Sequence, residues 1–151
     1  MALLKFTRGA QRVLCSEFVF NFNDTIVDIN GATKDFGTTI ASAPVVDIIK
    51  LPFGAEIIGG HLLVETQGVG PTTYTVKLGV AGDDATLLAA SDLLAVINTR
   101  YAILLTKALT CNAGLNVRLT MVDAANAATA GKFRISILWK IDGRMEEVYT
   151  T

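Results

Sequence analysis

The chain is poor in the residues that most often build catalytic and metal sites. Its 151 residues include one histidine, His61, and two cysteines, Cys15 and Cys111. A metal site with several histidines is therefore impossible. A Ser-His-Asp or Cys-His arrangement would have to use His61, and no nucleophile-elbow sequence surrounds the serines or cysteines. These shortages predict a protein that is not an enzyme.

Phosphate-binding and calcium-binding loop motifs are also incomplete. The run NAATAGKF at 126–133 lacks the first glycine and the final Ser or Thr of a phosphate-binding loop. The acidic residues Asp83, Asp84, Asp92 and Asp123 do not have the spacing of the oxygen ligands in an EF-hand. We interpret these carboxylates as solvated turn residues, and we expect no metal and no cofactor.

Charged residues are scarce as well. The 13 Lys and Arg against 14 Asp and Glu leave a net charge of -1 at pH 7. Such a chain has no basic field for a nucleic-acid backbone or an anionic membrane, so neither is expected as a direct partner. Charged residues form only 18% of the chain, hydrophobic residues form 51%, and the mean hydropathy is +0.46. This apolar excess indicates that part of the surface contacts another protein.

No apolar run is long enough to suggest a membrane span or a secretion signal. The richest stretch, 44–66, is interrupted by Asp47, Lys50 and Glu56. Charged residues are also spread through the first 18 residues, so the continuous apolar block of a signal peptide is missing. We therefore expect synthesis in a cytoplasm, where both thiols stay reduced.

Alternation of apolar and polar residues predicts several half-buried strands. The clearest example spans 132–142, where Phe133, Ile135 and Ile137 alternate with polar neighbours and Trp139 continues the buried face. Strands of this kind are typical of antiparallel sheets. The same period of two recurs in three further segments: 18–22, 73–80 and 115–121.

Turn-forming residues recur about every ten residues, a spacing typical of a β-sandwich or barrel. Segments 45–51 and 55–66 are rich in β-branched residues and flank the run from Pro52 to Gly54. We expect them to be consecutive strands joined by a tight turn. Gly59 and Gly60 interrupt the second of these strands, and we predict a bend there.

Two segments depart from the strand pattern. Residues 84–105 place apolar side chains at three- and four-residue spacings with alanines between them, which predicts one short helical or coil crossing. Residues 1–17 have no clear period and predict an extended N-terminal arm, leaving 18–151 as a single all-β, antiparallel sandwich domain. The apolar residues of the arm are most easily explained if it lies across a neighbouring subunit. The alternative is a first strand on the same core.

Four runs follow one another in the order VVDIIKLPFGAEIIGGHLLVET, YTVKLGVAGDD, LLAASDL and GKFRISILWKIDGRMEE. Over about residues 44–147 these runs resemble a group of small structural proteins of tailed bacteriophages. The resemblance implies a jelly-roll-like β-sandwich that decorates or cements the outer face of an icosahedral capsid. It further implies a virion location, the major capsid protein as partner, and a homo-oligomer, either a dimer or a trimer.

The resemblance assigns structural roles to the hairpin, the bend and the last strand. The residues concerned are Leu51, Pro52, Gly54, Gly59, Gly60, Asp142, Gly143 and Arg144. For contact with the capsid we select the arm, because arginine and apolar anchors dominate protein interfaces. The selected residues are Lys5, Phe6, Arg8, Arg12 and Leu14. The alternative for Arg8 and Arg12 is that water solvates both side chains.

Other functional classes remain open. A tail, fibre-base or head-completion protein would use a similar sandwich. A carbohydrate-binding module would need exposed aromatic residues, and the chain has only one Trp and three Tyr.

Overall fold

The structure is a computed structural model that describes residues 13–37, 44–103, 109–110, 115–124 and 126–141. These residues form strands and no helix, so none of them belongs to a helix long and apolar enough to cross a membrane. The strands are β1 (Leu14–Asn21), β2 (Thr25–Val27), β3 (Thr33–Asp35), β4 (Val45–Leu51), β5 (Ala55–Val69), β6 (Thr73–Val80), β7 (Asp83–Asp92), β8 (Arg100–Ala102), β9 (Leu109–Thr110), β10 (Leu115–Ala124) and β11 (Ala130–Ile141).

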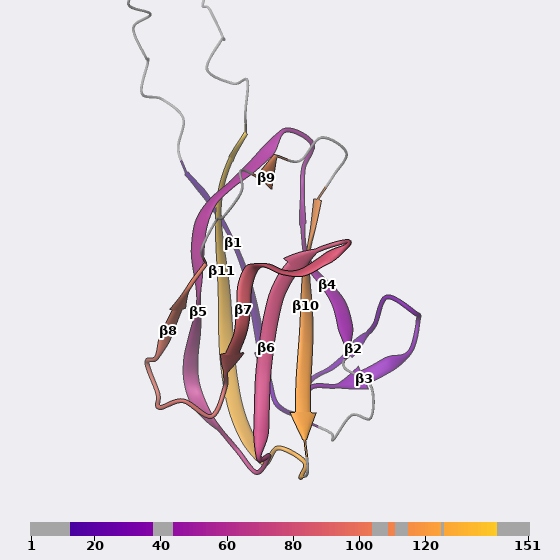
Figure 1. The fold of residues 1–151 in the computed structure, drawn as a ribbon, viewed down its shortest axis with the longest axis vertical. Coiled ribbons are helices and arrows are strands. Elements are labelled where there is room, and N and C mark those ends of the chain that lie inside the picture. The colour runs from indigo at the N-terminus through magenta and orange to yellow at the C-terminus, as the bar shows by residue number, and fades with distance from the viewer. Residues whose placement is uncertain (1–12, 38–43, 104–108, 111–114, 125, 142–151) are drawn as a thin grey trace, which may run out of the picture.

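The strands form two main sheets that lie face to face, with the small β2–β3 ribbon at one side (Figure 1). One sheet has the order β1-β11-β5-β8, with β9 also beside β5, and the other has the order β4-β10-β6-β7. All of these pairings are antiparallel. When the short strands β2, β3 and β9 are left out, the main strands follow one another in the chain as β1, β4, β5, β6, β7, β8, β10 and β11. Renumbered 1 to 8 in that order, they form one sheet with the order 1-8-3-6 and a second sheet with the order 2-7-4-5. This is the jelly-roll arrangement, so the predicted all-β sandwich is confirmed.

The core lies between the two sheets. β11 contributes Phe133 and Ile135, and β10 contributes Leu119 and Met121, all completely buried. The period-two pattern of both strands is thereby confirmed. At one end the core is aromatic: the ring centroids of Phe20 and Phe133 lie 5.2 Å apart. Further ring pairs extend this cluster, namely Phe20–Phe36 at 4.7 Å and Tyr74–Phe133 at 5.7 Å.

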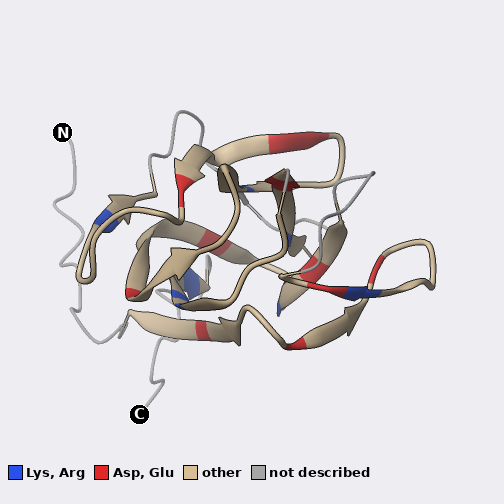
Figure 2. Cartoon of the chain, turned by 90° about the horizontal axis from the view of Figure 1, so that it is seen from below, with Lys and Arg blue, Asp and Glu red and all other residues tan. Residues whose placement is uncertain are grey.

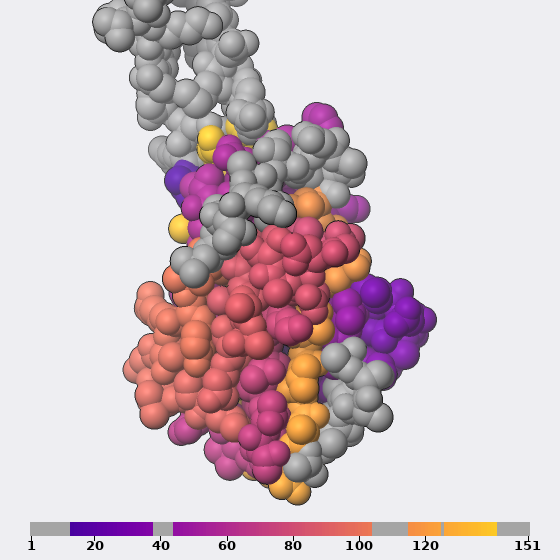
Figure 3. Space-filling view, in the orientation of Figure 1, coloured from indigo at the N-terminus to yellow at the C-terminus, as the bar shows by residue number. Residues whose placement is uncertain are grey.

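The helical alternative for residues 84–105 is wrong over the part of this segment that the structure describes. Residues up to Asp92 form β7, which pairs with β6 through an irregular register. Because of this irregularity, the consecutive side chains Leu87 and Leu88 are both buried. Two adjacent apolar residues of this kind break the period of two, and in the sequence they resemble the apolar spacing of a helix. Residues 93–99 form the predicted coil, and β7 and this coil occupy part of the face of the molecule seen in Figure 3, beside β6 and β10.

The tight turn at Pro52–Gly54 is confirmed, but its flanking strands do not pair. The Ala55 N–H donates to the Pro52 carbonyl at 3.1 Å, and Gly54 has a φ of 78°. β4 pairs with β10 and β5 pairs with β11, so the turn passes from one sheet to the other. The implied hairpin is therefore wrong, because a sandwich connection replaces it.

The predicted bend at Gly59 and Gly60 corresponds to a β-bulge. Leu138 lies opposite Gly59 and Trp139 lies opposite Ile57, which leaves Ile58 as the extra residue. Gly60 has a φ of 147°, and a Cβ atom there would lie 2.1 Å from the Ser136 carbonyl oxygen. Glycine is therefore required at Gly60 by both conformation and space.

Candidate interaction surface

Most of the predicted contact residues lie outside the described part of the chain. This applies to Lys5, Phe6, Arg8 and Arg12, and equally to the structural candidates Asp142, Gly143 and Arg144. Leu14 is the exception: it begins β1 opposite Trp139 and is 41% exposed. The segment 14–17, predicted to belong to the arm, pairs with β11, as in the alternative of a first strand on the same core.

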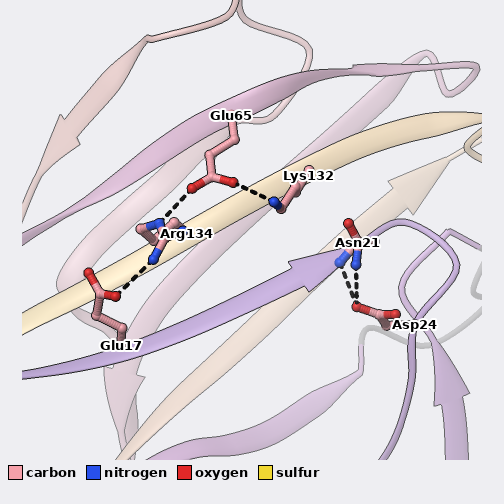
Figure 4. Close-up of polar contacts among 6 residues, drawn as sticks. All are labelled: Glu17, Asn21, Asp24, Glu65, Lys132 and Arg134. Carbon is pink, nitrogen blue, oxygen red and sulfur yellow. Dashed lines mark hydrogen bonds and ion pairs between the residues drawn. The ribbon is translucent and has the colours of Figure 1, made fainter.

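The outward face of the β1-β11-β5-β8 sheet carries a chain of ion pairs (Figure 4). Arg134 of β11 lies at its centre, with Nη1 2.8 Å from Glu17 Oε2 on β1 and Nε bonded to Glu65 Oε1 on β5. Lys132 Nζ lies 3.0 Å from the other oxygen of Glu65. The three strands are thus linked by two cations and two anions, so the charges within this group of four side chains balance.

These contacts shift the ionisation of their members in the expected directions. Hydrogen bonds from Arg134 and then Lys132 lower the pKa of Glu65. The hydrogen bond to Glu65 likewise raises the pKa of Arg134. A second group, on β4 and β10, behaves in the same way: Arg118 Nε donates to Asp47 at 2.7 Å and lowers the pKa of that carboxyl.

Local pairing neutralises most of the positive charge of the described residues. Lys77, Arg118, Lys132, Arg134 and Lys140 each have a nitrogen within 3.3 Å of a carboxylate oxygen. Figure 2 shows the basic residues spread over several strands. Such a surface suits contact with a protein better than contact with a phosphate backbone.

An exposed apolar row lies beside the ion-pair chain. Cys15 of β1 pairs with Leu138 of β11, and Leu138 pairs with Gly59, next to Ile58 of β5. Cys15 is exposed, and Leu138 and Ile58 are 37% and 38% exposed. Trp139, predicted to lie in the core, is only partly buried because it sits near the end of β11, where its indole N–H donates to Ser16 Oγ at 2.9 Å.

An open cavity of about 430 Å³ lies beside β1, between this strand and the β2–β3 ribbon. Its lining includes the aromatic residues Phe18, Phe20 and Phe36 together with Ile26. Asp24 borders it and fixes the end of β1, since its carboxylate accepts hydrogen bonds from the backbone and side-chain nitrogens of Asn21 at 2.7 and 3.0 Å (Figure 4). The cavity is thus a hollow with aromatic walls at the edge of a sheet.

Asp123 is not the solvated turn residue that the sequence suggests. It lies on β10 opposite Tyr74, is 3% exposed, and neither carboxylate oxygen has a hydrogen-bond partner among the described residues. Burial raises its pKa to about 6. Tyr74 is also buried, and its hydroxyl donates to the Phe36 carbonyl at 2.9 Å. Burial, followed by the nearby charges of Asp123 and Asp35, raises the pKa of this hydroxyl.

No catalytic constellation occurs in the part of the chain that the structure describes. His61 lies in β5 opposite Ser136 and Ala102, on strands that hold no further histidine. The described His, Cys, Asp and Glu residues form no group of three or more that could hold a metal ion. The surface features of the described residues are the chain of ion pairs, the apolar row and the cavity beside the edge strand.

Three solved capsid structures contain chains with the same arrangement of strands. A chain from the capsid of cyanophage Pam1 matches with a TM-score of 0.60 and 22% identity, over 93% of this chain and 94% of the other. A chain from the acid-stable capsid of Helicobacter pylori bacteriophage KHP30 matches with a TM-score of 0.58 and 19% identity, over 85% and 87%. The fold occurs in phage capsids.

The third match has the same extent. A chain from the capsid of Ralstonia phage GP4 gives a TM-score of 0.54 and 18% identity over 95% of this chain and 91% of the other. No family model matches the sequence, and no curated protein does. The resemblance to structural proteins of phage heads is thus confirmed at the level of the fold.

Proposed function

We propose that this protein is a structural component of a bacteriophage virion and that it decorates or cements the outer capsid surface. The observation that carries the proposal is the jelly-roll match to chains from three phage capsids over at least 85% of this chain, with no TM-score below 0.54. A jelly roll alone hosts many functions, so the site must support the assignment. The described surface supports it by offering ion-paired and apolar contact areas.

A cement protein works through binding free energy alone. It spans the seam between capsomers, and because it binds only the assembled shell, it stabilises that shell against the pressure of packaged DNA. This role needs no catalysis, cofactor or contact with the DNA. In this proposal the protein is made in the host cytoplasm, oligomerises, and binds the major capsid protein after the shell has formed.

The proposal assigns the capsid contact to the arm. Lys5, Arg8 and Arg12 supply three positive charges without an acidic residue in the segment 1–12, and Phe6 supplies an apolar anchor. Leu14 continues the apolar contact at the point where the arm joins β1. An arm of this composition suits an acidic groove with an apolar floor on the capsid protein.

The first test is the copy number of the protein in purified virions, measured by quantitative mass spectrometry. A decoration protein should be present in hundreds of copies that follow the major capsid protein stoichiometrically. A dozen copies or fewer would instead assign it to the tail or the portal. Absence from the virion would contradict the structural role as a whole.

The second test addresses the arm in the full-length protein. Replacing Lys5, Phe6, Arg8 and Arg12 together by Ala should abolish binding to purified undecorated shells in a co-sedimentation assay, while the circular dichroism spectrum stays unchanged. The control is Lys50→Ala, which removes one exposed charge from β4 and should leave binding intact. Undiminished occupancy with the arm variant would exclude the arm as the capsid contact.

A further inference from the structure

β1 is an edge strand without the features that normally prevent edge-to-edge association. Proteins protect sheet edges with charged residues, prolines or short strands. Of the other described edges, β4 carries Asp47 and Lys50, β7 begins and ends with aspartates, and β8 has three residues. β1 has eight residues and one charged side chain, Glu17, which already bonds to Arg134.

The backbone of β1 is oriented to accept another strand. The Phe22 N–H donates to the Gly131 carbonyl at 3.0 Å, toward β11, whereas the Asn21 N–H donates to Asp24 on the other side. In an antiparallel pair these directions alternate along the strand. The N–H and C=O groups of Cys15, Glu17 and Val19 therefore point away from β11, toward the free edge.

Three exposed apolar side chains lie at the same edge. Val13, Leu14 and Val19 are 55%, 41% and 37% exposed. The cavity with aromatic walls opens beside Phe18, whose side chain lies on the same face of the strand as Leu14. We propose that β1 pairs antiparallel with β1 of a second copy about a two-fold axis, so that the two sheets become one continuous sheet.

Charge and hydrogen bonding exclude most registers of such a pair. Centring it on Glu17 would place two carboxylates directly opposite each other, which is unfavourable. Centring it on Phe18 would require the Asn21 N–H, which Asp24 already occupies. Centring it on Cys15 would leave Val19 without a partner in the described part of β1.

The register centred on Ser16 satisfies all of these conditions. It places Val13 opposite Val19 on the outward face, and Leu14 opposite Phe18 on the inward face, next to the cavity. The backbone groups of Cys15 then meet those of Glu17 from the other copy. The two-fold axis makes every contact occur twice, as in other isologous dimers.

This pairing goes beyond the proposed function, because it requires no capsid. It predicts a dimer of the free protein, with twice the 16.1 kDa mass of one chain, and it joins the ion-pair chains and apolar rows of two copies side by side. Failure of shell binding in a protein that still dimerises would count only against the cement role. The two ideas can therefore fail separately.

Disulfide trapping tests the register in the full chain. In a Cys111→Ser background, Glu17→Cys should cross-link to Cys15 of the second copy under mild oxidation and give a dimer on a non-reducing gel. The matched control is Val19→Cys, on the same face of the same strand and lying opposite Val13. Equal or stronger trapping with Val19→Cys would overturn the register, and no trapping with either variant would overturn the pairing.

The oligomeric state tests the edge independently. Val19→Lys places a protecting charge on the free edge and should convert the dimer to a monomer in light scattering, with an unchanged circular dichroism spectrum. The control is Val96→Lys, at a residue that is 67% exposed in the coil between β7 and β8, and it should remain dimeric. A monomeric or trimeric wild type, or a dimer that survives Val19→Lys, would overturn the proposal.

Discussion

At the scale of single residues, burial controls the ionisation of Asp123. Its carboxyl has a pKa of about 6 in the folded protein, against an ordinary value of 3.8. Ionisation is therefore more costly in the folded state than in the unfolded state. The resulting stability is fully present below about pH 4 and is lost as the pH rises through about 6. Burial is the cause of this raised pKa, and Tyr74, which lies opposite Asp123, supplies no positive charge that would offset the loss.

Asp123→Asn should remove this pH dependence. Between about pH 4.5 and about pH 7.5 the wild type should lose about 2 kcal/mol of its free energy of unfolding relative to the variant, because Asn does not ionise. Urea unfolding at each pH measures this difference. Asp84→Asn, at a half-exposed carboxylate bonded to Lys77, serves as the control and should show no such change. A constant difference for Asp123→Asn would contradict the assigned pKa.

The adjacent glycines of β5 separate the effects of backbone strain and of space. Gly59 and Gly60 both have positive φ, of 154° and 147°, but a Cβ atom on Gly59 meets no atom within 4 Å. Gly59→Ala should therefore cost about 1 kcal/mol from strain, whereas Gly60→Ala should cost more than about 3 kcal/mol because it also displaces β11. Chemical denaturation of both variants checks the order. Equal losses would mean that contact with Ser136 does not restrict this position.

At the scale of secondary-structure elements, β11 organises the first sheet because it lies between β1 and β5. We expect the side chains of β11 to contribute less to the free energy of unfolding toward the end of the strand than in the aromatic core. Phe133→Ala should cost about 3–5 kcal/mol, because this side chain is completely buried against Phe20 and Tyr74. Trp139→Ala should cost about 1–2 kcal/mol, since the indole is only partly buried and loses one hydrogen bond. Thermal unfolding followed by near-ultraviolet circular dichroism measures both, and the reverse order would contradict the observed packing.

The elements that could be predicted from the sequence are those with one buried face. Over most of their length β6, β10 and β11 alternate because one side of each strand packs into the core and the other side is nearer to solvent. β7 was not predictable in this way, since its register irregularities bury Leu87 and Leu88 in succession. Local periodicity describes a regular ladder, and a bulged strand breaks that period.

Pairing between distant elements was less accessible to prediction. Nothing in the turn at Pro52 distinguishes a hairpin from a passage between sheets, because the choice depends on β10 and β11, more than 50 residues later in the chain. Asp123 was misassigned for a related reason: its burial comes from its place opposite Tyr74. The free edge of β1 did leave a signal, since the run VLCSEFVFN contains no lysine or proline.

At the scale of the whole molecule, the proposed function depends on which surfaces remain available once the sandwich has formed. The ion pairs among Glu17, Arg134, Glu65 and Lys132 link three strands of one sheet. Positive charge without a nearby acid is concentrated in the segment 1–12, which precedes β1. The proposed arrangement therefore combines a pairing edge on β1 with a basic segment for the capsid.

Binding to the shell should consequently depend on salt and should stabilise the shell. Adding the protein to undecorated shells should raise their melting temperature until the sites are filled, because the ligand binds only the assembled state. The increase should shrink at about 1 M salt, since screening weakens the contacts of Lys5, Arg8 and Arg12. Differential scanning calorimetry of decorated shells at low and high salt measures both effects. A salt-independent increase would shift the contact from the basic arm to the apolar row around Leu138, and no increase would contradict the cement role.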